Sequence, residues 1–128
     1  MKKRFKILIT DKNRKVRDFL QRELSAEGYE IRIAENDSSI LAEIDREDGV
    51  DLLVFDLEIP NIDSSMIFEK TQKRLPPLPV VIHTFLTEEA ERNWDSKNSG
   101  IYIEKSGNVE HLKAAIADAL EKFYPDRQ

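Results

Sequence analysis

The sequence predicts a single α/β domain in which a doubly wound parallel sheet is covered by helices on both faces. Five apolar runs alternate with segments of helical periodicity along 128 residues, and strict alternation is typical of a parallel sheet. The third run, Leu52–Phe55, is continuously apolar, as expected of a central strand buried on both faces. No repeat or internal linker interrupts the pattern. We therefore expect one domain at residues 1–124, with 125–128 as a free tail or the start of a linker.

The first half of the chain is predicted to form two strands and two helices. The run Phe5–Ile9 is the first strand, and the helix after it ends at Gly28. The second strand, Tyr29–Ile33, alternates apolar and polar residues, which is typical of a sheet edge. The second helix is predicted to end at Gly49, with its cap at Asn36, Asp37 or Ser38. The apolar residues of the first helix lie three and four residues apart on one face: Val16, Phe19, Leu20 and Leu24.

The second half is predicted to add three strands and three helices. The third helix breaks at Pro76, and the next apolar run, Val80–Ile82, is the fourth strand. A fourth helix starts at Thr87, and the fifth strand is Ile101–Ile103. The last helix carries one apolar stripe: Val109, Leu112, Ile116, Leu120 and Phe123.

Composition limits the function classes. The absence of cysteine excludes disulfides and cysteine nucleophiles and fits a cytoplasmic location. A net charge of −5 disfavours binding to nucleic acid. A membrane span needs about 20 apolar residues, and no run here approaches that length, so we expect no membrane segment. The basic start, Lys2-Lys3-Arg4, is not followed by the apolar stretch of a signal peptide.

Polar side chains follow four of the apolar runs at the points where the strands end. Asp11 follows the first run, Asp56 the third, Thr84 the fourth and Lys105 the fifth. Ligands of open α/β sheets bind at this edge, so we expect the four side chains to converge. A single Asp after a strand is most often a turn residue or a helix cap, but the whole set favours a shared site. His83 is expected to be a packed strand residue.

These side chains suit phosphoryl transfer to a carboxylate. Asp56 would supply the oxygen nucleophile, while Lys105 and Thr84 would stabilise charge on the phosphoryl oxygens. Asp11 would help to hold Mg²⁺, which prefers oxygen ligands. An independent hydrolase or phosphatase is the weakest alternative, because the sequence has no Gly-rich phosphate loop and no second acid or base beside Asp56. We expect no enzyme activity beyond self-phosphorylation and dephosphorylation at Asp56.

Four short segments at the predicted strand ends form an ordered pattern: Ile7–Asp11, Asp51–Asp56 with Pro60 four residues later, Pro79–Thr84 and Gly100–Lys105. In this order, with helix-sized gaps, they resemble the receiver domains of two-component response regulators. The resemblance runs from Lys6 to about Phe123 and implies a (βα)5 flavodoxin-like fold with sheet order 2-1-3-4-5.

The resemblance implies a role for each site residue. Asp56 would accept a phosphoryl group from a histidine kinase or phosphotransfer protein, and Thr84 and Lys105 would contact it. Mg²⁺ would be held by Asp11, Asp56 and the backbone carbonyl of Glu58.

The resemblance also implies a switch and an output face. Tyr102 matches the aromatic residue that changes rotamer on phosphorylation. The fourth helix, fifth strand and fifth helix would form the face for an output protein or a homodimer. Trp94, in the predicted fourth helix, is expected to be partly buried.

Lys12 departs from the family pattern, which has a second acidic residue there. If its side chain turns inward, Lys12 would repel Mg²⁺ and pair with Asp56, at about 4 kcal/mol before desolvation costs for a 4 Å separation and an effective dielectric near 20. It could instead point to solvent or pair with Glu58. Our hypothesis is that Lys12 replaces the charge of the metal, so that the domain binds Mg²⁺ poorly.

Three other departures lie close to the site. Ser106 replaces the usual Pro after Lys105, and we expect a trans bond there because a cis bond before a non-proline residue costs about 3–4 kcal/mol. Phe85 stands where a small residue is usual, so its ring either restricts the site mouth or packs outward. Ser64 replaces a Gly after Asp63, a mild change for a residue capping a helix.

Two functions remain after this comparison. The first is a signalling receiver that is phosphorylated on Asp56, with Mg²⁺-dependent phosphorylation impaired or altered by Lys12. The second is a pseudo-receiver that acts as a protein-interaction module without phosphorylation. Asp56, Thr84 and Lys105 favour the first function, whereas Lys12 and Ser106 favour the second.

Overall fold

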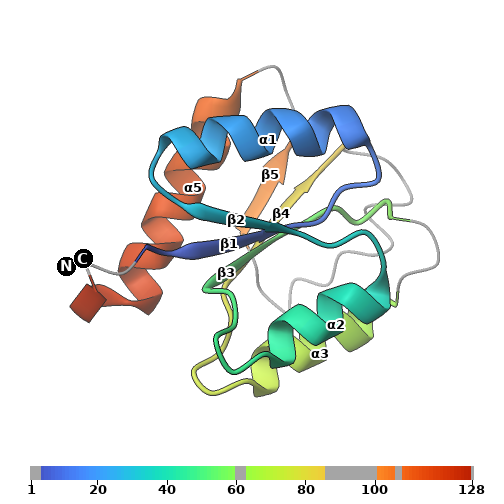
Figure 1. Ribbon diagram of the computed structural model, residues 1–128, viewed down its shortest axis with the longest axis vertical. Coiled ribbons are helices and arrows are strands. Elements are labelled where there is room, and N and C mark those ends of the chain that lie inside the picture. The colour runs from blue at the N-terminus through green and yellow to red at the C-terminus, as the bar shows by residue number, and fades with distance from the viewer. Residues whose placement is uncertain (1–3, 60–62, 86–100, 106–107, 128) are drawn as a thin grey trace.

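The computed structural model describes residues 4–59, 63–85, 101–105 and 108–127. Within these residues, five strands form one parallel sheet in the order β2-β1-β3-β4-β5 (Figure 1). This arrangement confirms the predicted fold class and strand order. The strands are β1 (Lys6–Ile9), β2 (Glu30–Ile33), β3 (Leu52–Phe55), β4 (Val80–Thr84) and β5 (Ile101–Glu104).

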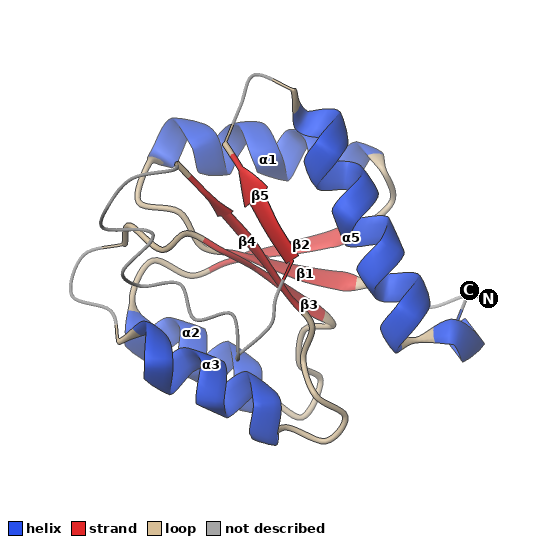
Figure 2. Ribbon diagram, turned by 180° about the vertical axis from the view of Figure 1, so that it is seen from behind, coloured by secondary structure: helices blue, strands red, loops and turns tan. Residues whose placement is uncertain are grey.

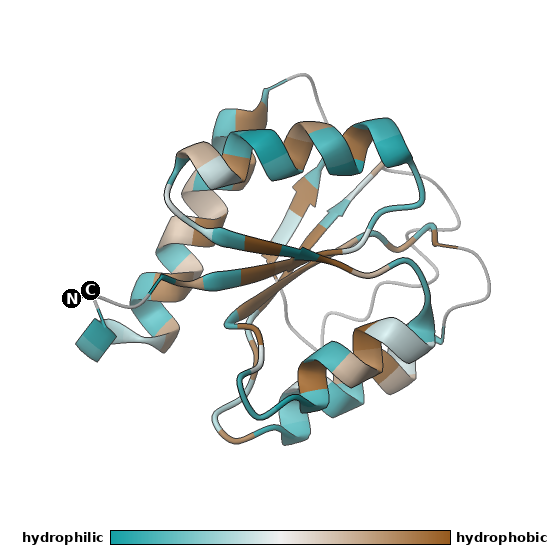
Figure 3. Ribbon diagram, in the orientation of Figure 1, coloured by the Kyte–Doolittle hydropathy of each residue, from teal (hydrophilic) through white to brown (hydrophobic). Residues whose placement is uncertain are grey.

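Helices cover both faces of the sheet (Figure 2). On one face lie α1 (Arg14–Ala26) and α5 (Val109–Phe123), and on the other lie α2 (Asp37–Asp45) and α3 (Ser64–Lys73). Alternate side chains of each strand enter two separate clusters: Ile9 and Val54 join the α1–α5 cluster, whereas Leu8 and Phe55 join the α2–α3 cluster. The apolar colouring is therefore concentrated along the central strands (Figure 3).

The helix ends agree with the sequence in part. Asn36 caps α2 through a capping box, as one of the predicted alternatives, and Gly28, with φ of 97°, follows the end of α1 as predicted. Gly49 does not end α2, which stops at Asp45 because Arg46 takes an extended conformation. A Cβ on Gly49 would lie 2.8 Å from the Arg46 carbonyl oxygen, so a close backbone approach explains this glycine.

The start of α3 also corrects one expectation. Asp63 caps this helix, because its side chain accepts a hydrogen bond of 3.1 Å from the Met66 amide. Ser64 is the first helical residue rather than the cap. The predicted fourth helix from Thr87, with Trp94, lies outside the described residues, and so does the Ser106 peptide. No helix in the described parts of the chain has the length and apolar character that crossing a bilayer requires.

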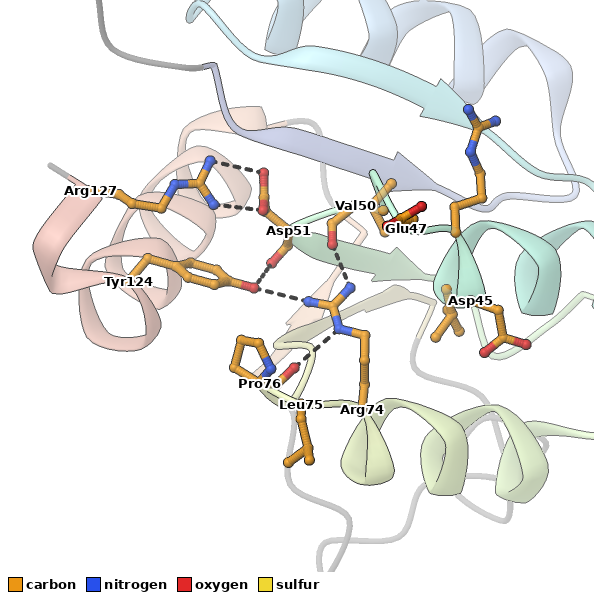
Figure 4. Close-up of a pocket in the computed structure, with 12 residues that line it drawn as sticks. Asp45, Glu47, Val50, Asp51, Arg74, Leu75, Pro76, Tyr124 and Arg127 are labelled. Atoms are coloured by element: carbon orange, nitrogen blue, oxygen red, sulfur yellow. Dashed lines mark hydrogen bonds and ion pairs between the residues drawn. The ribbon is translucent and has the colours of Figure 1, made fainter.

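The residues after α5 form a turn that contacts the chain just before β3. Residues Pro125–Arg127 form a 3-10 turn, and the Arg127 guanidinium binds the Asp51 carboxylate at 2.7 and 3.3 Å (Figure 4). The Tyr124 hydroxyl donates a 2.8 Å hydrogen bond to the Asp51 carbonyl. Tyr124 is buried, whereas Phe123 is 44% exposed, so the apolar stripe of α5 ends at Leu120 and the buried ring is Tyr124.

The pocket drawn in Figure 4 lies at the amino-terminal edge of the sheet, beyond the strand starts. Arg74 crosses it and donates hydrogen bonds to the carbonyls of Val50 and Pro76 and to the Tyr124 hydroxyl. These contacts tie the α3–β4 connection to β3 and to the end of α5. The arginines Arg74 and Arg127 are thus engaged in holding the fold together.

Candidate functional site

The carboxyl edge of the sheet brings together the four polar residues that follow the strands. Asp11 follows β1, Asp56 follows β3, Thr84 ends β4 and Lys105 follows β5. Each residue is buried, with 0 to 9% of its surface exposed. Parallel strands place their carboxyl ends at one edge, and buried ionisable groups require partners. Lys105 accordingly contacts both Asp11 and Asp56, and Thr84 contacts Asp56.

Both oxygens of the Asp56 carboxylate accept hydrogen bonds. The Oδ1 atom accepts from the Thr84 hydroxyl at 3.0 Å and from the Glu58 amide at 3.0 Å. The Oδ2 atom accepts from the Lys105 ammonium at 3.1 Å. Asp56 is therefore held by one hydroxyl, one backbone amide and one cation, which are the donor types that also stabilise phosphoryl oxygens.

Lys105 joins the two carboxylates of the site. Its Nζ atom lies 2.7 Å from Asp11 Oδ2 and 3.1 Å from Asp56 Oδ2, and 6% of its side chain is exposed. Burial raises the pKa of Asp11, and the Asp56 charge adds to this effect, while the hydrogen bond and charge of Lys105 oppose it. The two carboxylates and one ammonium leave this group of three with one negative charge in excess.

Backbone and side-chain contacts that the sequence did not reveal position the two carboxylates. The Thr10 hydroxyl donates to the Val54 carbonyl at 3.1 Å and accepts from the Asp56 amide at 3.4 Å. The Asn13 amide donates to Asp11 Oδ1 at 2.8 Å. The sequence could have indicated these contacts, because Thr10 directly precedes Asp11 and Asn13 follows it by two residues. Both residue types commonly form hydrogen bonds with nearby backbone.

Lys12 forms an ion pair with Glu58. Its Nζ atom lies 2.8 Å from Glu58 Oε2; 46% of the Lys12 side chain is exposed but only 9% of the Glu58 side chain. This is one of the three arrangements that the sequence left open. A pair with one exposed partner contributes at most about 1 kcal/mol. The main effect of this ion pair is on position. It links the β1–α1 loop to the loop that follows Asp56 and holds the Lys12 cation between them.

Phe85 and His83 both lie near Lys105. Phe85 is 51% exposed, and the Lys105 Nζ atom is 5.2 Å from the centre of its ring, a cation–π contact. The ring therefore lies over the cation of the site. His83 is a buried strand residue, as predicted, and burial together with the Lys105 charge lowers its pKa to about 4, so it is neutral at pH 7.

The remaining residues predicted from the sequence are the switch residue Tyr102 and the candidate Mg²⁺ ligands Asp11 and Asp56. Tyr102, in the middle of β5, is half-buried against the α2–α3 cluster. Asp11 and Asp56 supply two carboxylates suited to Mg²⁺. The described residues contain no group of three His, Cys or acidic side chains arranged to hold a metal. These two carboxylates are the side chains that would hold Mg²⁺.

Comparisons with known proteins agree with this geometry. A family model described as the response regulator receiver domain matches residues 7–117. The response regulator MprA of Mycobacterium leprae (strain TN) is 31% identical over 123 residues, which are 94% of this chain and 53% of that protein. The chain thus spans about half the length of this relative.

The fold is also similar to solved structures of receiver domains and response regulators. A CheY-like receiver domain protein from Methanospirillum hungatei JF-1 has a TM-score of 0.80 and 28% identity, over 97% of this chain and 99% of that one. The response regulator TrrA of Thermotoga maritima, in complex with Mg²⁺ and BeF, has a TM-score of 0.77 and 28% identity, over 91% and 99%. TrrA bound to the histidine kinase ThkA has a TM-score of 0.73 and 27% identity, over 91% and 98%.

Receiver domains of this family are in general non-enzymatic signalling modules of two-component systems. The sheet order, the converging strand-end residues and the match over residues 7–117 lead to one conclusion. The chain belongs to the response regulator receiver domain family.

Proposed function

We propose that this chain is a signalling receiver that accepts a phosphoryl group on the carboxylate of Asp56. The observation that carries the proposal is the surroundings of this carboxylate, which is 1% exposed and contacts the Thr84 hydroxyl and the Lys105 ammonium. The phosphoryl group would come from a histidine kinase or a phosphotransfer protein docked at the carboxyl edge of the sheet. The similar protein TrrA is bound to a histidine kinase.

The proposed step forms one bond and breaks one bond. An oxygen of Asp56 attacks phosphorus, and the bond from phosphorus to the donor nitrogen breaks with its electron pair remaining on nitrogen. Lys105 and Thr84, which hold the carboxylate before transfer, then donate to the phosphoryl oxygens. Tyr102 and the face formed by β5 and α5 would transmit the change to an output protein or a second copy.

We propose further that Lys12 weakens Mg²⁺ binding. The cation of Lys12 is paired to Glu58 beside Asp56, and it would repel a divalent ion held by Asp11, Asp56 and the Glu58 carbonyl. A bound Mg²⁺ would supply positive charge to the transferring oxygens. Lys12 already places one positive charge near this edge, so phosphorylation should depend less on the metal than in a receiver with two acids here. A cytoplasmic location is part of this proposal.

Intact-mass measurement tests the proposal directly. The protein is incubated with acetyl phosphate, with and without Mg²⁺. We expect a gain of about 80 Da, one phosphoryl group, that is lost in Asp56→Asn and kept in Asp63→Asn, a matched change at an exposed helix cap. A gain that survives Asp56→Asn would refute the assignment of the acceptor.

A second candidate function is a pseudo-receiver, and one observation favours it. Lys105 bridges Asp11 and Asp56, so a protein cation already pairs with the carboxylate without a metal or a phosphoryl group. In this state the domain would present one fixed surface to a partner protein. The absence of any mass gain with acetyl phosphate and with phosphorylated kinase would favour this function over the first.

A further inference from the structure

A cavity of about 400 Å³ opens beside the phosphoryl-acceptor edge, on the face of the sheet covered by α1 and α5. Its walls include Val16 and Phe19 from α1 and Val109 from the start of α5. These residues are apolar, and Phe19 is 37% exposed. The volume lies in the range of small-molecule pockets, which are mostly apolar with a few placed polar groups.

One polar side chain in the wall has a ring nitrogen that pairs with none of the described residues. His83 lines the cavity and is only 9% exposed. Its Nδ1 atom is buried and, among the described residues, has no hydrogen-bond partner. Buried polar groups are nearly always paired with protein, water or a ligand, so this nitrogen marks a place for a hydrogen-bonding atom inside an otherwise apolar space.

The other polar wall residue determines the charge of the occupant. Lys105 lines the cavity, but its ammonium is already held by Asp11 and Asp56 and is covered by the Phe85 ring. His83 carries no charge at pH 7, because its pKa is lowered to about 4. The described wall residues therefore offer no unpaired cation to an anionic ligand, and the cavity favours a neutral one.

We propose that this cavity binds a small, uncharged, largely apolar molecule whose single hydrogen-bonding group pairs with the His83 imidazole. The Lys105 side chain connects the cavity with Asp56, since it lines the one and contacts the other. Under the proposed function, an occupant and a phosphoryl group would affect the same side chain, and each would change the affinity for the other.

Two probes of nearly equal shape test the site by NMR titration of the full chain. They are 4-methylphenol, which has one hydroxyl group, and toluene, which has none. We expect 4-methylphenol to bind about two- to tenfold more tightly, the effect of one neutral hydrogen bond. This ratio should fall to about one in His83→Leu, which keeps an apolar wall but removes the nitrogen. Intermolecular NOEs should join both probes to the Val109 methyl groups.

A cavity-filling variant and a control complete the test. Val16→Phe should abolish binding of both probes, whereas Phe123→Ala, which removes an exposed ring in a different groove on α5, should leave binding unchanged. Equal affinities of the two probes in the unmodified protein would overturn the proposal. So would NOEs that place the probes in the Phe123 groove, and this readout does not depend on any variant being folded. Neither result bears on phosphorylation of Asp56.

Discussion

Replacing Lys105 by Met tests whether this cation holds the site together. The substitution leaves Asp11 and Asp56, whose side chains are 1% and 0% exposed, as two neighbouring carboxylates without their shared cation. Removing one partner of a buried ion pair costs about 3–5 kcal/mol. This is a large part of the total stability of a typical domain, which is about 5–15 kcal/mol.

Urea unfolding at pH 7 measures the loss. With a slope of about 2 kcal/mol per molar, the midpoint of Lys105→Met should fall by about 2 M. Lys73→Met is the matched control, because the Lys73 side chain is 73% exposed and pairs only with Glu69 among the described ion pairs. We expect its midpoint to stay unchanged.

The dependence on pH separates a charge effect from a packing effect. Burial already raises the pKa of Asp11 and the Asp56 charge adds to this effect; without Lys105, the hydrogen bond from the Asn13 amide is the one opposing contact that remains among those that shift this pKa. The folded variant then binds a proton more strongly than the unfolded chain, so its stability falls as pH rises above 3.8. Lys105→Met should thus lose less stability at pH 5 than at pH 7, and adding Asp11→Asn should restore about 1–2 kcal/mol at pH 7.

Two results would refute this reasoning. The first is a loss below about 1 kcal/mol at pH 7, the range of surface pairs. The second is a loss that stays the same at pH 5 and in the double variant, which would attribute the effect to the lost lysine stem rather than to the charges.

Three further predictions concern other contacts. Lys12→Asp should strengthen Mg²⁺ binding at least about tenfold, because it replaces a repelling charge with a ligand, as read from the Asp56 amide resonance. The lowered pKa of His83 means that the unfolded chain binds more protons between pH 6.5 and 4. Up to about 3 kcal/mol should therefore be lost as pH falls through that range, but not in His83→Leu. Arg127→Ala should cost about 1–2 kcal/mol in urea unfolding, because it removes the paired hydrogen bonds to Asp51.

Each of these predictions has an outcome that contradicts it. Lys15→Asp makes the same charge change at an exposed position of α1, and an equal gain in Mg²⁺ affinity there would show a general field effect. Identical pH profiles of His83→Leu and the unmodified protein would exclude the histidine as the cause. For the C-terminal turn, full stability of Arg127→Ala would mean that the Asp51 pair contributes nothing measurable.

The fold was predictable because two independent patterns agreed. Continuous apolar runs marked the central strands, and the residues after them marked one edge of the sheet. The exact ends of individual helices were harder to predict. Gly49 suggested a helix end, but it serves a close approach to the Arg46 carbonyl. Phe123 continued the helical stripe of α5, but Tyr124 is the buried ring because its hydroxyl can reach the Asp51 carbonyl.

The sequence indicated at which edge of the sheet the candidate site lies. It indicated only some of the side-chain contacts within that site. Strand order alone brings Asp56, Thr84 and Lys105 together. The partner of Lys12 was not predictable, because a long side chain can reach several acids with small differences in free energy. The role of Thr10 was also hidden, since its two hydrogen bonds depend on how β1 and β3 align.

The Arg127–Asp51 contact has a practical consequence for the attachment of probes. Arg127 contacts Asp51 and the ring of Phe5, which directly precede β3 and β1 at the amino-terminal edge of the sheet, while Asp56 follows the carboxyl end of β3. A fluorescent protein or surface tether joined at either end of this domain would be separated from the acceptor carboxylate by the length of the strands. Such fusions should leave access for a phosphodonor unobstructed, and any signal that they detect must pass through the body of the sheet.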